Sequence, residues 1–277
     1  MRHAGRRWLF CAALLTAVGT WVSLQVGPAS ATLITTAGHA TSNARTAANV
    51  RTAAAGYVSP TKNLYFGDHG PAIRSIQSRL TQLGYYAGPA SGRYGSNLEE
   101  AVWAFKEVQG LPMNAKTNSV ITTAFRQALV HPRQPNSRFP RGGAGRIEVN
   151  LGIQVLVLYR HSKPYLILHI SSGGGYYFCA APGNCADAVT PDGSYTALSY
   201  LPGTITVALG QMENPVFFIG TVYAIHGGER VPWYPDSHGC VRIYSDVVKW
   251  FHNQVQIGST PIYIFGKAPY RPKLALG

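Results

Sequence analysis

The spacing of apolar residues changes once along the chain, and this change constrains the fold more than any other feature. Between residues 63 and 130, apolar residues recur at intervals of three and four, which is the period of one helix face. From residue 146 to about residue 266 they alternate with polar residues or form short blocks bounded by glycine and proline, a pattern typical of β-strands. We therefore expect a multidomain α + β chain, with a small helical module followed by a β-rich domain.

Three helices are expected in the first segment. Pro71 suits the first turn of a helix, and Gly84 and Gly110 can end helices in the left-handed conformation. The apolar positions form three groups with helical spacing: Ile73, Ile76, Leu80 and Leu83; Leu98, Ala101, Val102, Phe105 and Val108; Val120, Ala124, Phe125 and Leu129. They predict a three-helix module over residues 63–130.

The second segment contains several short apolar runs separated by turn residues. A short helix is expected over residues 246–251, with Ser245 as its N-cap, because a serine hydroxyl can accept a hydrogen bond from the first turn. Many short strands with glycine turns indicate a β-sandwich or barrel over residues 146–267. The expected strands cover residues 147–151, 153–159, 165–170, 216–225 and 261–265.

The N-terminus has the layout of an export signal. Three arginines precede an apolar run over residues 8–26, and Ala29-Ser30-Ala31 forms a small-x-small cleavage site. Residues 1–31 are therefore predicted to be a signal peptide, with an uncleaved membrane anchor as the alternative because the apolar run is long. Either reading predicts an exported, extracytoplasmic chain.

Two further segments are predicted to be linkers, and a third is predicted to be a C-terminal tail. Residues 32–62 are rich in Ala, Thr, Ser and Asn, which predicts a flexible linker or tether. Residues 131–145 hold three prolines and three glycines, which predicts an interdomain linker. Residues 268–277 are expected to form a C-terminal tail.

The chain is strongly basic, with a formal net charge of +13. Such an excess favours anionic partners. No motif that interleaves aromatic and basic residues for nucleic-acid binding is present, so we expect no nucleic-acid partner. For an exported chain, the charge favours anionic cell-wall polymers or a membrane surface.

The cysteines divide into a pair and a single residue. Loss of residues 1–31 would remove Cys11 and leave Cys179, Cys185 and Cys240. Cys179 and Cys185 flank a turn-like Ala-Ala-Pro-Gly-Asn segment, and an exported chain can join them in a disulfide. Cys240 is then the odd cysteine, which in an exported protein indicates a reactive thiol.

Several residues that could take part in catalysis lie close to Cys240 in the sequence. The cluster consists of Ser237-His238-Gly239-Cys240-Val241-Arg242, with His226 upstream. A reactive thiolate needs a base or a positive environment, which His226, His238 and Arg242 can supply. Gly239 permits a tight turn that directs backbone N–H groups at an oxyanion. The cluster fits a cysteine acyl-transfer site. A buried thiol beside structural histidines is the alternative, whereas a zinc site lacks the paired ligand spacing.

At these residues the chain resembles the YkuD-type catalytic domain of the L,D-transpeptidases, over about residues 146–266. The motifs occur in the family's order: Gln154 and Tyr159; Ser171-Ser172-Gly173; Thr190-Pro191-Asp192-Gly193; Ile225-His226-Gly227; the cluster around Cys240; Asp246; and Gly258 followed by Pro261-Ile262-Tyr263-Ile264. Residues 63–130 resemble the peptidoglycan-binding domain family through Leu83-Gly84-Tyr85, Gly92-Arg93-Tyr94-Gly95 and Gly110-Leu111.

The resemblance implies roles for the site residues. It makes Cys240 the nucleophile and His226 the general base, whose orientation is set by the Gly227 carbonyl. It further implies that backbone N–H groups of His238, Gly239 and Cys240 form the oxyanion hole, supported by Ser237. Arg242 would brace the loop or hold a substrate carboxylate, and Tyr223 would contact substrate.

The implied activity is crosslinking of peptidoglycan stem peptides through a cysteine thioester, with no metal or organic cofactor. Stem peptides and glycan are the implied partners, and carbapenems the implied inhibitors. Two alternatives remain open at this point. An L,D-carboxypeptidase would use water as acceptor, and a non-catalytic wall-binding protein would need no reactive Cys240.

Overall fold

The computed structural model describes residues 62–228 and 231–269, all of which fall within one compact unit. The predicted signal peptide or anchor lies outside the described residues, as do nearly all of the linker 32–62 and most of the tail. Within the described ranges we find no helix with the length and apolar character that a bilayer span requires.

The helical segment contains α2 (Pro71–Gln82), α3 (Ser96–Gln109) and α4 (Thr123–Val130). Pro71 opens α2 as predicted, and Gly110 ends α3 at a φ of 69°. The apolar positions predicted for the first two helices are largely buried. The third group was partly wrong, because α4 begins only at Thr123 and leaves Ala124 exposed. Phe125 and Leu129 are buried as predicted, and Ile121 is buried in place of Val120 and Ala124.

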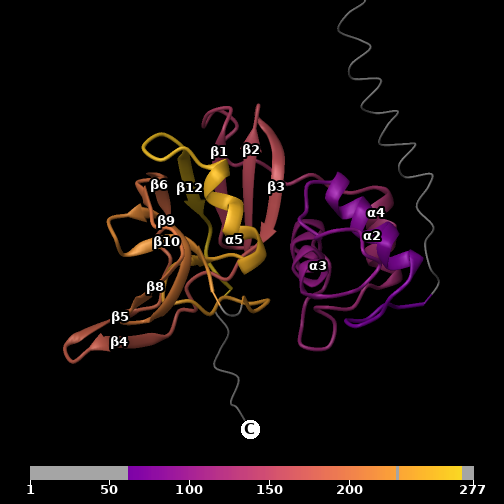
Figure 1. Ribbon diagram of the computed structural model, residues 1–277, viewed down its shortest axis with the longest axis horizontal. Helices are drawn as coiled ribbons and strands as arrows, with labels where there is room; N and C mark the ends of the chain where they lie inside the picture. The colour runs from indigo at the N-terminus through magenta and orange to yellow at the C-terminus, as the bar shows by residue number, and fades with distance from the viewer. Residues whose placement is uncertain (1–61, 229–230, 270–277) are drawn as a thin grey trace, which may run out of the picture. The chain divides into compact units, whose positions relative to one another are not determined.

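A mixed sheet forms one layer of the β-rich domain, with β1, β2 and β3 side by side (Figure 1). Its strand order is β3-β2-β1-β12-β6, and β1 runs parallel to β12 whereas the other neighbours are antiparallel. The strands are β1 (Arg146–Asn150), β2 (Val155–Arg160), β3 (Lys163–His169), β6 (Gly193–Thr196) and β12 (Pro261–Phe265).

A second sheet carries His226 and ends beside Cys240, the predicted base and nucleophile. Its order is β11-β10-β9-β7, with β8 also paired to β9, and β10 runs parallel to β11. The strands are β7 (Ser199–Tyr200), β8 (Thr204–Val207), β9 (Gly210–Ile219), β10 (Tyr223–Gly227) and β11 (Val241–Arg242).

The main core combines residues of both sheets with α5 (Ser245–Phe251), which the 3-10 helix η1 (His252–Gln254) extends. Val149 and Leu158 of the first sheet share this core with Ile225 of the second. The domain is therefore built as two sheets packed on one another. Ser245 is not the N-cap of α5: the cap position is Tyr244, and the Ser245 hydroxyl donates to the Gly228 carbonyl at 2.7 Å.

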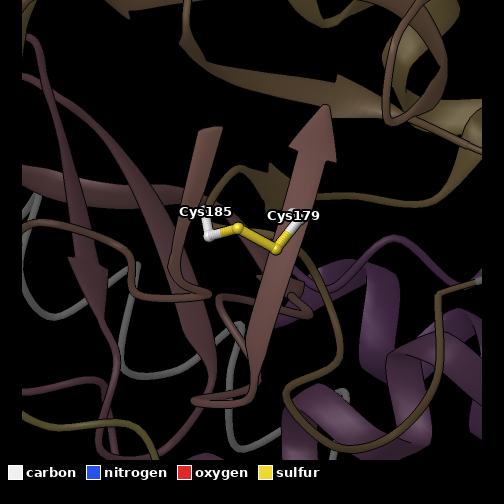
Figure 2. The surroundings of a disulfide bond; sticks show 2 residues. All are labelled: Cys179 and Cys185. Atoms are coloured by element: carbon white, nitrogen blue, oxygen red, sulfur yellow. A yellow bond between two sulfur atoms is a disulfide. The ribbon is translucent and has the colours of Figure 1, made fainter. Parts of the chain in front are cut away.

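A short two-stranded ribbon, β4 (Tyr177–Ala181) and β5 (Asn184–Asp187), extends from the sheets (Figure 1). Cys179 and Cys185 face each other across its two strands and form a disulfide (Figure 2). The predicted cysteine pairing is therefore confirmed, and Cys240 is the free cysteine among the described residues.

The helical module packs against the first sheet, because β2 has apolar side chains on both of its faces. Leu156 and Leu158 of β2 point into the main core, whereas the alternate residues Val155, Val157 and Tyr159 pack in one apolar cluster with the helices. Strand β2 is consequently buried from both sides.

The predicted linker 131–145 is held by side chains along this surface. Gln109 exchanges two hydrogen bonds with the Arg133 backbone, at 3.0 and 2.8 Å. Phe139 stacks on Tyr263 with ring centroids 4.4 Å apart. These contacts secure the segment against both the helical module and the first sheet.

Candidate active site

Strand pairing brings the predicted nucleophile and base to one face of the second sheet. In the parallel pair, Ile225 lies opposite Val241, and both are fully buried in the main core. Because side chains alternate along a strand, His226 points to the opposite face, together with Ala224 of the same strand. Cys240, which directly precedes β11, packs in the cluster that contains Ala224 rather than in the main core.

His226 is held in one tautomer by its neighbour. Its Nδ1 lies 2.5 Å from the carbonyl oxygen of Gly227. A carbonyl can only accept a hydrogen bond, so Nδ1 carries the hydrogen and Nε2 keeps a free lone pair. Burial lowers the pKa of His226 to about 4, and the positive charge of Arg242 acts in the same direction. The imidazole is therefore neutral at pH 7 and able to accept a proton.

Cys240 is half-buried, and its Sγ lies 3.6 Å from the carbonyl oxygen of Val222. Burial raises the pKa of the Cys240 thiol, although a hydrogen bond to the Ala224 backbone and the charge of Arg242 oppose this. The resting pair is thus a thiol beside a neutral imidazole.

The turn before Cys240 is closed by the Ser237 hydroxyl. Ser237 Oγ donates to the Cys240 carbonyl at 2.6 Å and accepts from the Gly239 N–H at 3.0 Å. The Gly239 N–H is therefore already engaged by a side-chain hydroxyl in this structure. Among the described residues we find no acceptor for the N–H groups of His238 and Cys240, so these two remain available.

Glycine is required at position 239. Its φ is 137°, and a Cβ there would lie 2.7 Å from the Tyr223 ring and 2.9 Å from the Val189 carbonyl oxygen. Tyr223, the predicted substrate contact, thus packs directly on the catalytic turn. A side chain at position 239 would displace one of these neighbours and strain the backbone.

Two hydroxyl groups that carried no predicted role tie the neighbouring loops to this turn. Thr190 Oγ1 accepts from the Gly173 N–H and donates to the Gly239 carbonyl, both at 2.8 Å. Ser171 Oγ donates to the Tyr234 carbonyl at 2.8 Å and accepts from the Asp236 N–H at 3.0 Å. Both belong to motifs visible in the sequence, but only the fold reveals their partners.

Arg242 and His238 support the turn from two sides. The Arg242 guanidinium donates to the Asp236 carbonyl, which favours the loop-bracing role of the two that were considered. The His238 ring lies edge-on to Phe178 and Tyr176, at centroid distances of 4.7 and 5.5 Å. The disulfide-linked ribbon therefore contributes aromatic contacts to the site, which the sequence motifs did not reveal.

Two parts of this chain match known protein families, and the chain resembles solved structures. Residues 144–264 match the model of the L,D-transpeptidase catalytic domain, and residues 69–120 match that of a peptidoglycan-binding domain. The L,D-transpeptidase of Xylanimonas cellulosilytica DSM 15894 (residues 123–326) is 31% identical, with 75% of this chain and 99% of that chain covered and a TM-score of 0.68. The chain belongs to the L,D-transpeptidases.

Two further L,D-transpeptidase structures are more distant. That from Stackebrandtia nassauensis is 16% identical, covering 77% of this chain and 100% of that chain with a TM-score of 0.43. One from Mycobacterium tuberculosis H37Rv is 17% identical, covering 44% of this chain and 58% of that chain with a TM-score of 0.36. A search of curated proteins returned no match.

Proposed function

We propose that this L,D-transpeptidase crosslinks peptidoglycan stem peptides through a thioester on Cys240. The observation that carries the proposal is a neutral His226, oriented by Gly227, on the sheet face where Cys240 packs with Ala224. A neutral base beside a protonated thiol suits attack with simultaneous proton transfer. Base assistance of this kind typically contributes about 10²–10⁴-fold in rate.

The first half-reaction forms the acyl-enzyme. Nε2 of His226 takes the thiol proton as Cys240 Sγ attacks the carbonyl after the third, L-centred stem residue. The free N–H groups of His238 and Cys240 stabilise the oxyanion. The carbon–nitrogen bond then breaks, and the proton held by His226 passes to the amine of the departing D-alanine.

The second half-reaction transfers the acyl group. An amine of another stem peptide attacks the thioester carbon, and His226 takes the proton that this amine loses. The carbon–sulfur bond breaks, and the same proton returns to Cys240 as the crosslink is released. Two half-reactions through one covalent intermediate give ping-pong kinetics.

The helical module would hold the enzyme on its polymer. Its match to a peptidoglycan-binding domain supports glycan and stem peptides as partners. The excess of basic residues supports attraction to anionic wall polymers outside the membrane. An extracytoplasmic location is part of the same proposal, because the substrate lies there.

The proposal is tested by intact-protein mass spectrometry with and without a carbapenem. One covalent adduct on the wild type and none on Cys240→Ala supports an activated thiol. A folded wild type without an adduct would favour a non-catalytic wall-binding protein. Incubation with tetrapeptide muropeptides then separates the acceptors: crosslinked dimers support transpeptidation, whereas tripeptides alone would indicate an L,D-carboxypeptidase that uses water.

A further inference from the structure

A buried histidine outside the catalytic pair joins the helical module to the segment between β10 and β11. His169 ends β3 and is only 2% exposed. Its Nδ1 lies 2.8 and 3.0 Å from the two carboxylate oxygens of Glu107 on α3. Its Nε2 lies 2.9 Å from the carbonyl oxygen of Pro232. Both ring nitrogens are therefore engaged, with partners far apart in the sequence.

In the hydrogen bond between His169 and Pro232, the histidine must be the donor. A carbonyl cannot donate, so Nε2 of His169 carries a hydrogen, and Nδ1 shares one proton with Glu107. Burial raises the pKa of Glu107 and lowers the pKa of His169, and the shared proton can lie on the carboxyl group or on Nδ1. In either arrangement Nε2–H still donates to Pro232, so the bond to the loop persists.

Pro232 belongs to the segment that connects the base to the nucleophile, since it lies between His226 and Ser237. Farther along this segment, Ser171 holds the backbone of Tyr234 and Asp236 from within the β-rich domain. The bond from His169 adds an anchor whose orientation depends on α3. The position of the segment is therefore tied to the helical module.

The module is packed firmly enough to act as such an anchor. Phe105 of α3 lies in one apolar cluster with Val157 and Ile167 of the first sheet. Trp103 of the same helix meets the His169 ring edge-on, with centroids 5.2 Å apart. Glu107 is thus presented by a helix that is fixed against the sheet carrying His169.

We propose that the helical module positions the active-site loop, with Glu107 orienting His169 and His169 fixing the Pro232 carbonyl. This inference rests on the proposed function and gives the module a second role beside holding the wall. Glu107 and His169 are positioning residues, since neither touches a reacting atom. Shifts of about 1 Å in a catalytic group can cost about 10²-fold in rate, so loosening this anchor should slow acylation even by a soluble reagent.

The test uses the full chain with graded substitutions. Glu107→Ala removes the orienting carboxylate, and His169→Phe keeps a ring but removes both hydrogen bonds. Glu107→Gln is the conservative variant, because an amide can still bond to Nδ1. Glu99→Ala is the matched control: Glu99 is also on α3, but its carboxylate accepts from Ser119 Oγ within the module, at 2.5 Å.

Three quantities are measured for each variant: the rate of Cys240 acylation by a carbapenem, sedimentation with isolated peptidoglycan, and hydrogen exchange of the Asp236 and Ser237 amides. Glu107→Ala and His169→Phe should slow acylation by about tenfold or more, through kcat rather than KM where turnover is followed. Their loop amides should exchange faster, while sedimentation stays unchanged. Glu107→Gln should recover most of the rate, and Glu99→Ala should match the wild type.

Folded Glu107→Ala and His169→Phe proteins with wild-type acylation and exchange would overturn the inference. If His169→Phe fails to fold, the comparison of Glu107→Ala with Glu107→Gln decides. A wild type that forms no adduct would refute the proposed function instead. The exchange measurement still tests the anchor in that case, because it requires no turnover.

Discussion

The Nδ1 atom of His226 lies 2.5 Å from the carbonyl oxygen of Gly227, the next residue in the chain. This contact fixes the ring in one orientation and leaves Nε2 as the proton acceptor. Because the partner is uncharged, the ring gains no carboxylate that would raise its proton affinity, and burial dominates. The base is consequently neutral over a wide range of pH.

His226→Ala should lower the rate of Cys240 acylation by about 10²–10⁴-fold, because attack would lose its proton acceptor. The rate of adduct formation with a carbapenem measures this effect. His131→Ala is a suitable control, since His131 is exposed at the end of α4. Acylation of folded His226→Ala at the wild-type rate would exclude His226 as the base.

The acylation rate should depend on pH through His226. With a pKa of about 4, the base stays unprotonated as the pH falls from 7 to 5, so the rate should change little over this range. Below about pH 4 it should fall roughly tenfold per pH unit as the base is protonated. A rate profile with carbapenem checks this, and an acid limb near pH 6.5 would contradict it.

The lowered pKa of His226 also makes the stability of the protein depend on pH. The folded-state pKa of His226 lies below its ordinary value of 6.5, so the unfolded chain binds the proton more tightly. The contribution of His226 to stability is present above about pH 6.5 and is lost as the pH falls toward 4. Between pH 6.5 and pH 4, the free energy of unfolding should therefore fall more steeply for the wild type than for His226→Ala. Urea titration of both proteins at several pH values would measure this difference.

Gly239→Ala should destabilise the catalytic turn. The added Cβ would meet the Tyr223 ring at 2.7 Å at a backbone φ of 137°. Strain of this kind costs about 1–3 kcal/mol in the free energy of unfolding, and the displaced turn should also slow acylation. Gly145→Ala is the matched control, because its φ is outside the left-handed region and a Cβ there would meet only the Tyr159 carbonyl oxygen, at 4.0 Å. Equal effects of the two changes in urea unfolding would argue against this account.

Thr190→Val should weaken the link between two loops. It removes the hydroxyl that bonds both the Gly173 N–H and the Gly239 carbonyl, leaving two backbone groups without these partners. An unsatisfied buried polar group costs about 1–3 kcal/mol. Thr190→Ser retains the hydroxyl and should preserve most of the stability and acylation rate. If serine and valine behave alike, methyl packing rather than the hydroxyl explains the effect.

Residue patterns within short stretches of sequence were enough to predict several helices and strands, the disulfide and the cluster around Cys240. The spacing around Ile76 and Phe105 predicted helices, and the alternation before Gly152 predicted a strand, because each reflects the period of one element. The cysteine cluster and the Cys179–Cys185 pair were also visible, since each depends on residues close in sequence. The same reasoning missed β4, β5, β7, β8 and β11, which are short or exposed and carry little apolar pattern. It also joined β9 and β10 into one expected strand over residues 216–225, because the turn between them interrupts the apolar run only briefly.

Contacts between distant segments were decided only by the tertiary structure. The apolar run of β2 does not reveal that Leu156 points into one core and Val157 into another, because both sides of the strand look alike in sequence. The pairing of β10 with β11 and the packing of Cys240 in the cluster with Ala224 bring His226 and Cys240 to one face. The engagement of the Gly239 N–H by Ser237 and the anchor from Glu107 through His169 depend on three-dimensional hydrogen-bond partners. A sequence specifies which groups can bond, whereas packing determines which of them meet.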